Sequence, residues 1–310
     1  MHLSVNELAA RLVDRPGLIP TAIDALRKRT LWVDWNGYHC YEGFFNDSLA
    51  MYTTLLGGKP SAFSSPLDSL LSPAVISAIR NSCMEPTGFI FHAGRCGSTL
   101  IVKALGRCRK NLVFGEAAPH NQIWQAIGDT DPAIETYRNL LILMGRKRLP
   151  SHTAHIVKFT SFNIVQYPFI REAFPRVPAV FLFREPGGIL QSCRRTAPAW
   201  LGRDLGIGKT WDTVESAIED FFLAALAVDE PGFHCLDYQD LSAGILPAIL
   251  RLFHLDPAPA ELQLMKAEFA SDAKSLAPPP FLPASPTQSP TPARLIDLYA
   301  RLRRRAPVTA

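Results

Sequence analysis

The sequence of 310 residues contains no run approaching the roughly eighteen consecutive apolar residues that a membrane helix requires. Its N-terminus, MHLSVNELAARLVDRPG, carries acidic residues early and has no apolar core of signal-peptide length. Cysteine is also scarce: the six cysteines are scattered, and none are paired at metal-ligand spacing. This pattern argues against a disulfide framework and favours a reducing compartment. We therefore expect a soluble, cytoplasmic protein.

Charge of either sign is low. Charged residues make up 19% of the chain and the formal net charge is only +4, spread along the sequence. Such a balance is compatible with anionic ligands but is too weak to indicate nucleic-acid binding. No cluster of Asp or His residues indicates a metal site, so we expect none. The 47% of hydrophobic residues is an ordinary globular composition.

Short apolar segments alternate with helical patterns after residue 86. This alternation predicts a parallel sheet covered by helices on both faces, a three-layer α/β/α fold that spans residues 87–270. The first strand is expected in GFIFHA from residue 88, directly before a turn and a helix. Further strands are expected at Asn111–Phe114, His155–Phe159, Val180–Phe183 and His234–Leu236, and helices at Pro132–Met144, Tyr167–Phe174, Gly187–Arg195, Trp211–Val228 and Gly244–Phe253.

The segments on either side of this region contain no motif that indicates a chemical activity. Residues 1–86 are interpreted as a helical, aromatic-rich accessory region packed on the core, with residues 4–28 forming a helical segment interrupted near Pro16 and Pro20. Residues 271–310 comprise an extended proline-rich segment, APPPFLPASPTQSPTP, followed by a short helix, ARLIDLYARLRRR, with a basic end.

The loop Gly94-Arg95-Cys96-Gly97-Ser98-Thr99 lies where the apolar strand turns into a helix. Backbone N–H groups at the start of a helix are unpaired and lie at the positive end of its dipole, so they can bind a phosphate. Gly97 would allow the phosphate to approach closely, and the Ser98 and Thr99 hydroxyls would add donors. The structural alternative is that this turn only connects the strand to the helix and binds no ligand.

The loop lacks the lysine of the nucleotide-hydrolysing motif G-x-x-x-x-G-K-[ST], because serine stands between Gly97 and Thr99. Its positive side chain is Arg95, inside the turn. We also expect no apolar strand that ends in a magnesium-binding aspartate. Both absences count against a kinase or other nucleotide-hydrolysing enzyme, which remains the alternative function beside a non-catalytic nucleotide-binding protein.

FHAGRCGSTLIVKAL resembles the loop with which sulfotransferases hold the 5'-phosphosulfate of 3'-phosphoadenosine 5'-phosphosulfate (PAPS). VFLFREPGGILQS is similar to a second element of that family, a strand that ends in arginine with a serine eight residues later. The resemblance implies that Arg184 and Ser192 bind the 3'-phosphate of the donor. The two elements stand about 90 residues apart, which suits the family. The likeness covers roughly residues 87–255.

Two weaker likenesses concern catalysis. LVFGEAAPHNQI resembles the tyrosylprotein branch of the family, which implies Glu116 as the catalytic base, and HIVKFTSF resembles a strand whose lysine contacts the donor, here Lys158. Outside the core, the chain is similar only to uncharacterised bacterial members. The Lys-Thr-His segment of cytosolic sulfotransferases is absent, because Phe159 and Thr160 follow Lys158. The Gly-rich segment that covers the 3'-phosphate is also missing, and Lys274 or the arginines at 301–305 are candidate substitutes.

On this reading Arg95, Lys158 and the helix N-terminus stabilise the leaving phosphate, and Glu116 accepts the acceptor's proton. Each residue also has a structural interpretation. Glu116 could favour a helix dipole, Lys158 could protect a strand edge, and Arg184 could pair with Glu185 or Glu172.

Other residues near these motifs are expected to have mainly structural roles. His92 is expected to pack or hydrogen-bond at the strand end, and Cys96 to be a small loop residue rather than a nucleophile. His120 is a spare base candidate. The aromatic residues Trp32, Trp35, Tyr38, Phe44 and Phe45 are expected in the core, and the acceptor pocket is expected to draw on this N-terminal region. The acceptor is expected to be a small molecule or a peptide; peptide tyrosine, sugar, lipid and small phenol are all left open, as is the oligomeric state.

Overall fold

The computed structural model describes residues 1–310 apart from 36, 129–131, 241–243, 270–290 and 307–310. The predicted proline-rich segment at 277–292 lies almost wholly outside the described residues, as does Lys274. Within the described part of the chain, no helix combines the length and the apolar character needed to cross a membrane.

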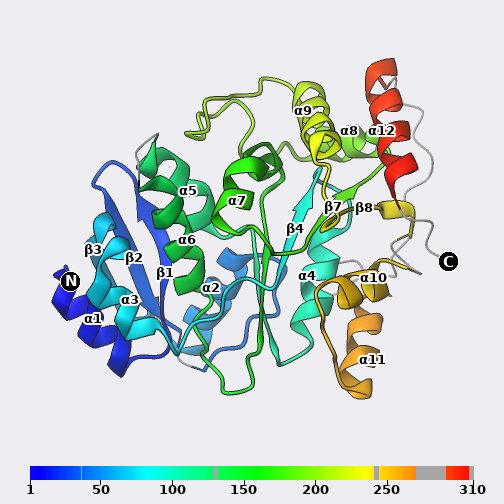
Figure 1. The fold of residues 1–310 in the computed structure, drawn as a ribbon. Coiled ribbons are helices and arrows are strands. Elements are labelled where there is room, and N and C mark those ends of the chain that lie inside the picture. Colours follow the sequence, from blue (N-terminus) through cyan, green and yellow to red (C-terminus); the bar gives the residue numbers. More distant parts are fainter. Residues whose placement is uncertain (36, 129–131, 241–243, 270–290, 307–310) are drawn as a thin grey trace.

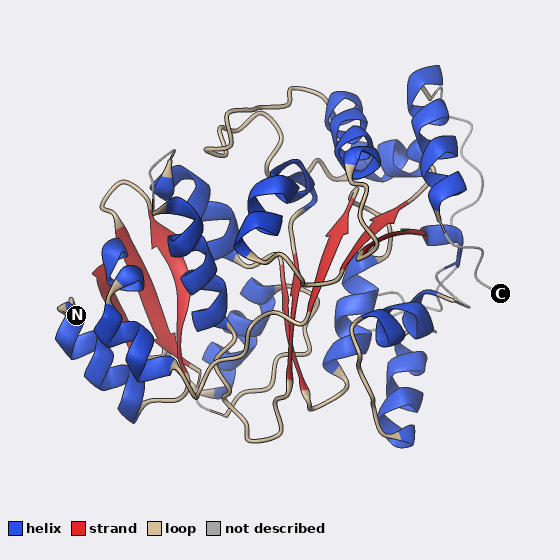
Figure 2. Ribbon diagram, in the orientation of Figure 1, coloured by secondary structure: helices blue, strands red, loops and turns tan. Residues whose placement is uncertain are grey.

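A five-stranded parallel sheet forms the centre of the molecule, as the sequence predicts (Figures 1 and 2). The strand order is β5-β6-β4-β7-β8, so β4, which leads into the glycine-rich loop, lies in the middle. The carboxyl ends of all five strands therefore meet at one edge of the sheet. The strands are β4 (Gly88–His92), β5 (Asn111–Gly115), β6 (Ala154–Lys158), β7 (Ala179–Phe183) and β8 (Phe233–Asp237).

Residues on the two faces of this sheet belong to two separate buried clusters. Phe89 and Phe91 pack with residues of α5 to α9, whereas Ile90 packs with residues of α4, α10 and α11. Both faces are apolar because a parallel sheet is covered by helices on both sides. This confirms the three-layer α/β/α architecture. The covering elements are α4 (Ser98–Gly106), α5 (Ala118–Ile127), α6 (Ala133–Met144), η2 (Ser161–Gln166), α7 (Tyr167–Ala173), α8 (Pro186–Arg195), α9 (Val214–Ala227), η3 (Tyr238–Asp240), α10 (Ile245–Leu252) and α11 (Pro259–Glu268).

The prediction of a helical segment over residues 4–28 is wrong beyond Asp14. Helix α1 ends there, and Leu18–Asp24 forms the first strand of a three-stranded antiparallel sheet. The physical reason is the run LIPTAID, in which Pro20 interrupts helical hydrogen bonding and isoleucine and threonine favour an extended backbone. The N-terminal elements are α1 (Val5–Asp14), β1 (Leu18–Asp24), β2 (Arg29–Asp34), α2 (Phe45–Leu55), β3 (Ala62–Pro66), η1 (Leu67–Leu71) and α3 (Pro73–Ile79).

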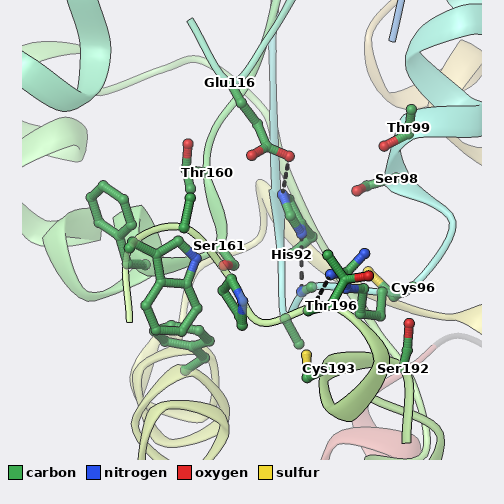
Figure 3. Close-up of a pocket in the computed structure, with 18 of the residues that line it drawn as sticks. His92, Cys96, Ser98, Thr99, Glu116, Thr160, Ser161, Ser192, Cys193 and Thr196 are labelled. Atoms are coloured by element: carbon green, nitrogen blue, oxygen red, sulfur yellow. Dashed lines mark hydrogen bonds and ion pairs between the residues drawn. The ribbon is translucent and has the colours of Figure 1, made fainter. Parts of the chain in front are cut away.

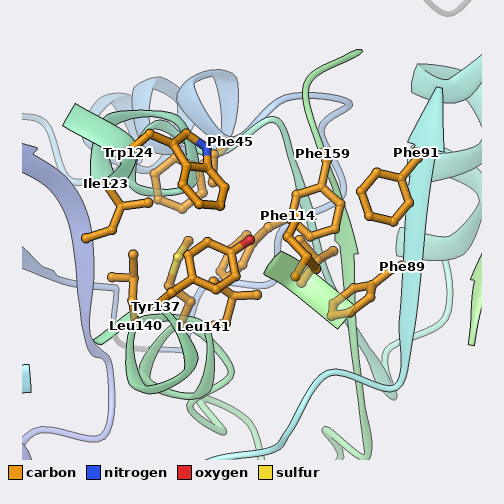
Figure 4. Packing of buried hydrophobic residues seen from close by; sticks show 14 of the residues in the cluster. Phe45, Phe89, Phe91, Phe114, Ile123, Trp124, Tyr137, Leu140, Leu141 and Phe159 are labelled. Atoms are coloured by element: carbon orange, nitrogen blue, oxygen red, sulfur yellow. The ribbon is translucent and has the colours of Figure 1, made fainter. Parts of the chain in front are cut away.

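A helix contact, a hydrogen bond and aromatic packing join this N-terminal sheet to the rest of the chain. Helix α5 lies against β1, and the side chain of Gln122 accepts a hydrogen bond from the Ile23 N–H at 2.8 Å. Phe45 stacks on Trp35 and meets Phe114 of β5 edge to face, within the cluster that Figure 4 shows between the small sheet and β4. Trp32, Trp35 and Phe45 are thus core residues, as expected.

The C-terminal helix α12 (Ala293–Arg305) covers the outer strand β8, where the sequence predicted a helix. Its Tyr299 hydroxyl donates to Asp237 at 2.7 Å, and Arg303 pairs with the same carboxylate at 3.2 Å. Arg305 donates to the carbonyls that end α9. Arg303 and Arg305 therefore anchor the helix, and neither arginine lines the cleft described below.

We expected no apolar strand that ends in a magnesium-binding aspartate, yet β8 is apolar and ends in Asp237. Its carboxylate is fully buried and is held by Tyr299, Arg303 and the N–H of Gln239. It lies at the edge of the sheet and does not line the cleft. Asp237 thus holds α12 in place, and its buried carboxylate is not accessible to a metal-nucleotide.

Candidate functional site

A cleft of about 1020 Å³ opens at the carboxyl edge of the central sheet. The segments that follow β4, β5, β6 and β7 all contribute to it, and α2 of the N-terminal region closes part of it. The cleft contains every residue of the glycine-rich loop together with Glu116, Arg184 and Ser192. Lys158, the other residue expected to act in catalysis, does not line it. Figure 3 shows Ser98, Thr99 and Glu116 around the same space.

The loop after β4 has the backbone geometry of an anion-binding turn. Gly94, Arg95 and Gly97 have positive φ angles of 85°, 55° and 76°, and Gly97 caps the N-terminus of α4 without any side-chain cap. Within the described chain, the N–H groups of Arg95, Cys96 and Gly97 donate to no backbone carbonyl. Unpaired donors at a helix N-terminus fit a phosphate or sulfate group.

His92 is buried and holds this loop in place through a hydrogen bond to its first residue. Its Nδ1 accepts the Gly94 N–H at 3.0 Å, so the proton resides on Nε2, which donates to the Phe159 carbonyl at 2.9 Å. Burial, followed by the nearby Lys158 charge, lowers the pKa of His92. The expectation that His92 hydrogen-bonds at the strand end is confirmed, and a neutral ring in this tautomer links β4 to the end of β6.

Glu116 and Lys158 form an ion pair at the ends of adjacent strands. The Lys158 ammonium is fully buried and donates to Glu116 Oε1, while the Glu116 side chain is 23% exposed and reaches the cleft. Burial raises the pKa of Glu116, but Lys158 and His92 outweigh burial and lower it to about 2. Phe44 covers the ammonium, 5.0 Å from Nζ to the ring centroid. Lys158 is therefore an interior partner of Glu116 and protects no strand edge.

Arg184 lies across the loop from Glu116. Its guanidinium packs over Tyr238 at 4.4 Å and donates to the Arg95 carbonyl at 3.3 Å. The ion pairs of the described residues do not include one between Arg184 and Glu185 or Glu172, and Glu185 instead accepts from the Gly188 N–H. Gly188 leaves room for it, since a Cβ there would stand 2.8 Å from Arg184 Nε. Ser192 lies about one turn beyond Gly188 on α8, in the same cleft. Arg184 and Ser192 therefore line one cleft, where a guanidinium and a hydroxyl can donate to an anionic group.

Two other loop residues have mainly structural contacts. The Arg95 guanidinium donates to the Thr196 carbonyl at 2.6 Å, at the C-terminal end of α8. The Cys96 thiol is buried, donates to the Leu182 carbonyl, and has its pKa raised by burial to about 11. Cys96 therefore remains a neutral thiol and is the small loop residue that we expected.

His120 is excluded as a base in this geometry. Its side chain is buried, it does not line the cleft, and burial lowers its pKa to about 3. Phe44 departs from the expected core role, because it lines the cleft beside Asn46 and Asp47. No group of three or more potential metal ligands occurs among the described residues.

Sequence reasoning missed the other wall of the cleft. Thr160, Ser161 and Phe162 follow β6, Asn121 comes from α5, and the segment 196–205 includes Trp200 and Arg203. Asn121 donates to the Thr160 hydroxyl at 2.9 Å and accepts from Asn163 at 3.0 Å. The only signal in the sequence was position, because residues after the ends of parallel strands meet at one edge. The segment 196–205 has no periodic pattern to mark it.

Comparisons with known proteins leave the function open. No protein-family model matches the sequence, and no curated protein matches it. Among solved structures the chain is similar to the "Sulfotransferase Domain from the Curacin Biosynthetic Pathway", with a TM-score of 0.43 and 13% identity over 73% of this chain and 100% of that domain. A likeness at this level says nothing about a substrate, so the functional argument depends on the cleft.

Proposed function

We propose that the chain is a sulfotransferase that moves a sulfuryl group from PAPS to a hydroxyl, or an amine, of an acceptor. One observation carries the proposal: a single cleft brings together the loop of residues 94–99, Arg184 with Ser192, and Glu116. These groups come from three separate parts of the sequence. They supply a carboxylate after β5, a cradle for a phosphosulfate after β4 and a cationic site for a second phosphate after β7, in that spatial order across the sheet.

The donor would lie along the loop. Its 5'-phosphosulfate would meet the free N–H groups of Arg95, Cys96 and Gly97 and the hydroxyls of Ser98 and Thr99, and its 3'-phosphate would meet Arg184 and Ser192. The space that Gly188 leaves for the guanidinium supports this assignment. Arg95, already bonded to Thr196, would add positive charge to the same end of the cleft.

In the transfer, the acceptor oxygen forms a bond to sulfur as the bond from sulfur to the 5'-phosphate oxygen breaks. The products are the sulfated acceptor and 3'-phosphoadenosine 5'-phosphate, and the hydroxyl proton passes to Glu116. The protein contributes alignment and charge rather than a covalent intermediate. The developing negative charge on the leaving phosphate falls beside the N-terminus of α4, where the helix dipole favours it.

Glu116 suits the role of proton acceptor because its pair with Lys158 keeps it ionised, yet a pKa of about 2 makes it a weak base while that pair persists. We expect the Lys158 ammonium to turn toward the sulfuryl oxygens when donor is bound. That movement would remove the charge that depresses the pKa of Glu116 and would strengthen the base at the moment it is needed. Lys158 then serves first as the partner of the carboxylate and afterwards as a cation for the transferred group.

The absence of the nucleotide-hydrolysing lysine and the structural use of Asp237 count against a magnesium-dependent kinase. The test is calorimetric titration with 3'-phosphoadenosine 5'-phosphate in EDTA, beside ATP with magnesium. We expect micromolar binding of the first ligand, and loss of that binding by about a hundredfold in Arg184→Ala, as for a charge-assisted contact. Preference for magnesium-ATP, or no binding of the bisphosphate, would overturn the proposal.

A further inference from the structure

The cleft has two ends, and the strand order assigns them. Arg184 follows β7 on one side of the loop-bearing strand β4, while Glu116 follows β5 on the other side, beyond β6. If the donor phosphates occupy the loop and the Arg184 end, the acceptor must enter from the Glu116 end. The residues that line this end come from α2, α5, η2 and the segment 196–205.

An aromatic wall covers part of the acceptor end. Trp200 is half-buried and packs on Phe221 of α9 at 5.6 Å, on Trp211 at 5.8 Å and on Phe162 of η2 at 6.5 Å between ring centroids. Trp200, Phe162 and Phe221 all line the cleft. Rings held in place from two other elements form a preformed surface on which a flat apolar body can stack.

Arg203 lies beside this wall, and hydrogen bonds hold the backbone of the residues before and after it. The Gly202 N–H donates to the Trp211 carbonyl at 2.9 Å, and the Asp204 carbonyl accepts from Gln125 of α5 at 2.8 Å. Gly206 packs so closely on α5 that a Cβ there would stand 2.6 Å from the Gln125 nitrogen. Gln125 lies in the last turn of α5, about two turns from the N-terminal end of the helix, which follows Glu116, and this attachment places Arg203 on the α5 side of the cleft, which is the acceptor end.

The Arg203 guanidinium lines the cleft and, among the described residues, pairs with no carboxylate. The carboxylates that line the cleft are Glu116, already paired with Lys158, and Asp47, exposed in the first turn of α2 where a helix dipole favours a negative charge. The acceptor end thus presents a cation on a held backbone beside an aromatic surface. Arg195, the remaining cation of the cleft, is three residues beyond Ser192 on α8 and therefore belongs to the donor end.

We infer that the acceptor is a hydroxylated organic acid with a flat apolar body, whose carboxylate binds Arg203 while its ring stacks on Trp200 and its hydroxyl reaches Glu116. This inference rests on the proposed function. Guanidinium and carboxylate match in a two-point hydrogen-bonded geometry, which gives orientation as well as attraction. The contact is made equally before and during transfer, so it lowers KM and leaves kcat nearly unchanged.

The test uses three phenols with the same ring and different ends: 3-(4-hydroxyphenyl)propanoate, its neutral primary amide, and tyramine. Each is titrated calorimetrically into protein saturated with 3'-phosphoadenosine 5'-phosphate, and each is assayed for transfer from PAPS. We expect the acid to bind about tenfold more tightly than the amide, and tyramine to bind more weakly than both. Arg203→Glu should reverse the order of the acid and tyramine, and Arg203→Met should make the acid and amide equal.

Arg176→Glu, an exposed arginine outside the cleft, is the matched charge-reversal control and should leave the preference intact. Unchanged affinity for the bisphosphate in each Arg203 variant shows that the variant is folded. Equal binding of acid and amide by the native protein, an unaltered preference in Arg203→Glu, or binding of none of the phenols would overturn the inference while donor binding stands. Failure of the bisphosphate itself to bind would instead overturn the proposed function.

Discussion

Glu116 and Lys158 terminate adjacent parallel strands and are tied together twice. The Glu116 N–H donates to the Lys158 carbonyl at 2.8 Å, and the buried Lys158 ammonium donates back to the Glu116 carboxylate. Glu116 has a positive φ of 51°, which is uncommon for a residue with a side chain, and this turn directs the carboxylate toward the cleft. The pair therefore links the strand register to the chemistry of the site.

Glu116→Gln should abolish transfer and leave affinity for 3'-phosphoadenosine 5'-phosphate within about twofold, because glutamine accepts no proton and lies at the acceptor end. It should also cost about 3–5 kcal/mol of unfolding free energy, since the Lys158 charge stays buried without its partner. Urea denaturation and a transfer assay measure the two effects. The double variant Glu116→Gln/Lys158→Met should regain part of the stability; normal transfer by Glu116→Gln would rule out the base assignment.

Gly188→Ala should weaken donor binding without removing a charge. The added Cβ would stand 2.8 Å from the Arg184 guanidinium and displace it from Tyr238, so we expect about a tenfold loss in affinity for the bisphosphate. Calorimetry gives the measurement. Gly232→Ala is the matched control, because that glycine has open space around it. Equal affinity in both variants would show that the position of Arg184 is unimportant.

Gly43→Ala should push the N-terminal region away from the glycine-rich loop of residues 94–99. A Cβ at residue 43 would stand 2.2 Å from the Thr99 Cγ2 atom, and the Gly43 carbonyl already lies where a Cβ on Gly115 would be. We expect a loss of about 1–3 kcal/mol in stability, as for overpacking, together with weaker bisphosphate binding because Thr99 must move. Thermal unfolding with and without the ligand measures both. Gly58→Ala, at an open position, should change neither.

Acid should destabilise the fold from about pH 6.5 downward. Burial lowers the pKa values of His120, His152 and His155 to about 3, so the unfolded chain binds more protons than the folded chain between pH 6.5 and about 3. Stability is thus fully present above pH 6.5 and falls as the pH drops through that window, by up to about 4 kcal/mol per pH unit for three histidines. Denaturant midpoints at several pH values measure the slope.

His120→Leu supplies the control for this slope. Neither ring nitrogen of His120 has a hydrogen-bond partner among the described residues, and the ring packs near Phe159. An apolar side chain at this position should therefore remove about a third of the pH dependence without loss of stability at pH 5. A pH dependence unchanged from that of the native protein would mean that other groups cause the acid sensitivity.

Local patterns were sufficient to predict most of the central sheet. The five strands are short apolar runs of β-branched and aromatic residues, and such runs are extended wherever they are buried on both faces. The basic C-terminal helix was likewise predicted at the residues where it occurs, because its apolar spacing repeats at helical period. Helices α5 and α11 were missed, since their patterns begin at prolines within turn-rich stretches.

The sequence by itself determined the strand-loop-helix at residues 88–106 and the chemistry of its side chains, because each depends on neighbours in the chain. Tertiary structure alone decided three things: that Lys158 faces Glu116 instead of the cleft, that Asp237 holds a helix, and that Arg203 and Trp200 share a wall. These relationships join residues 40 or more positions apart or residues of an irregular segment. Strand order and burial set them, and no local pattern in the chain encodes either.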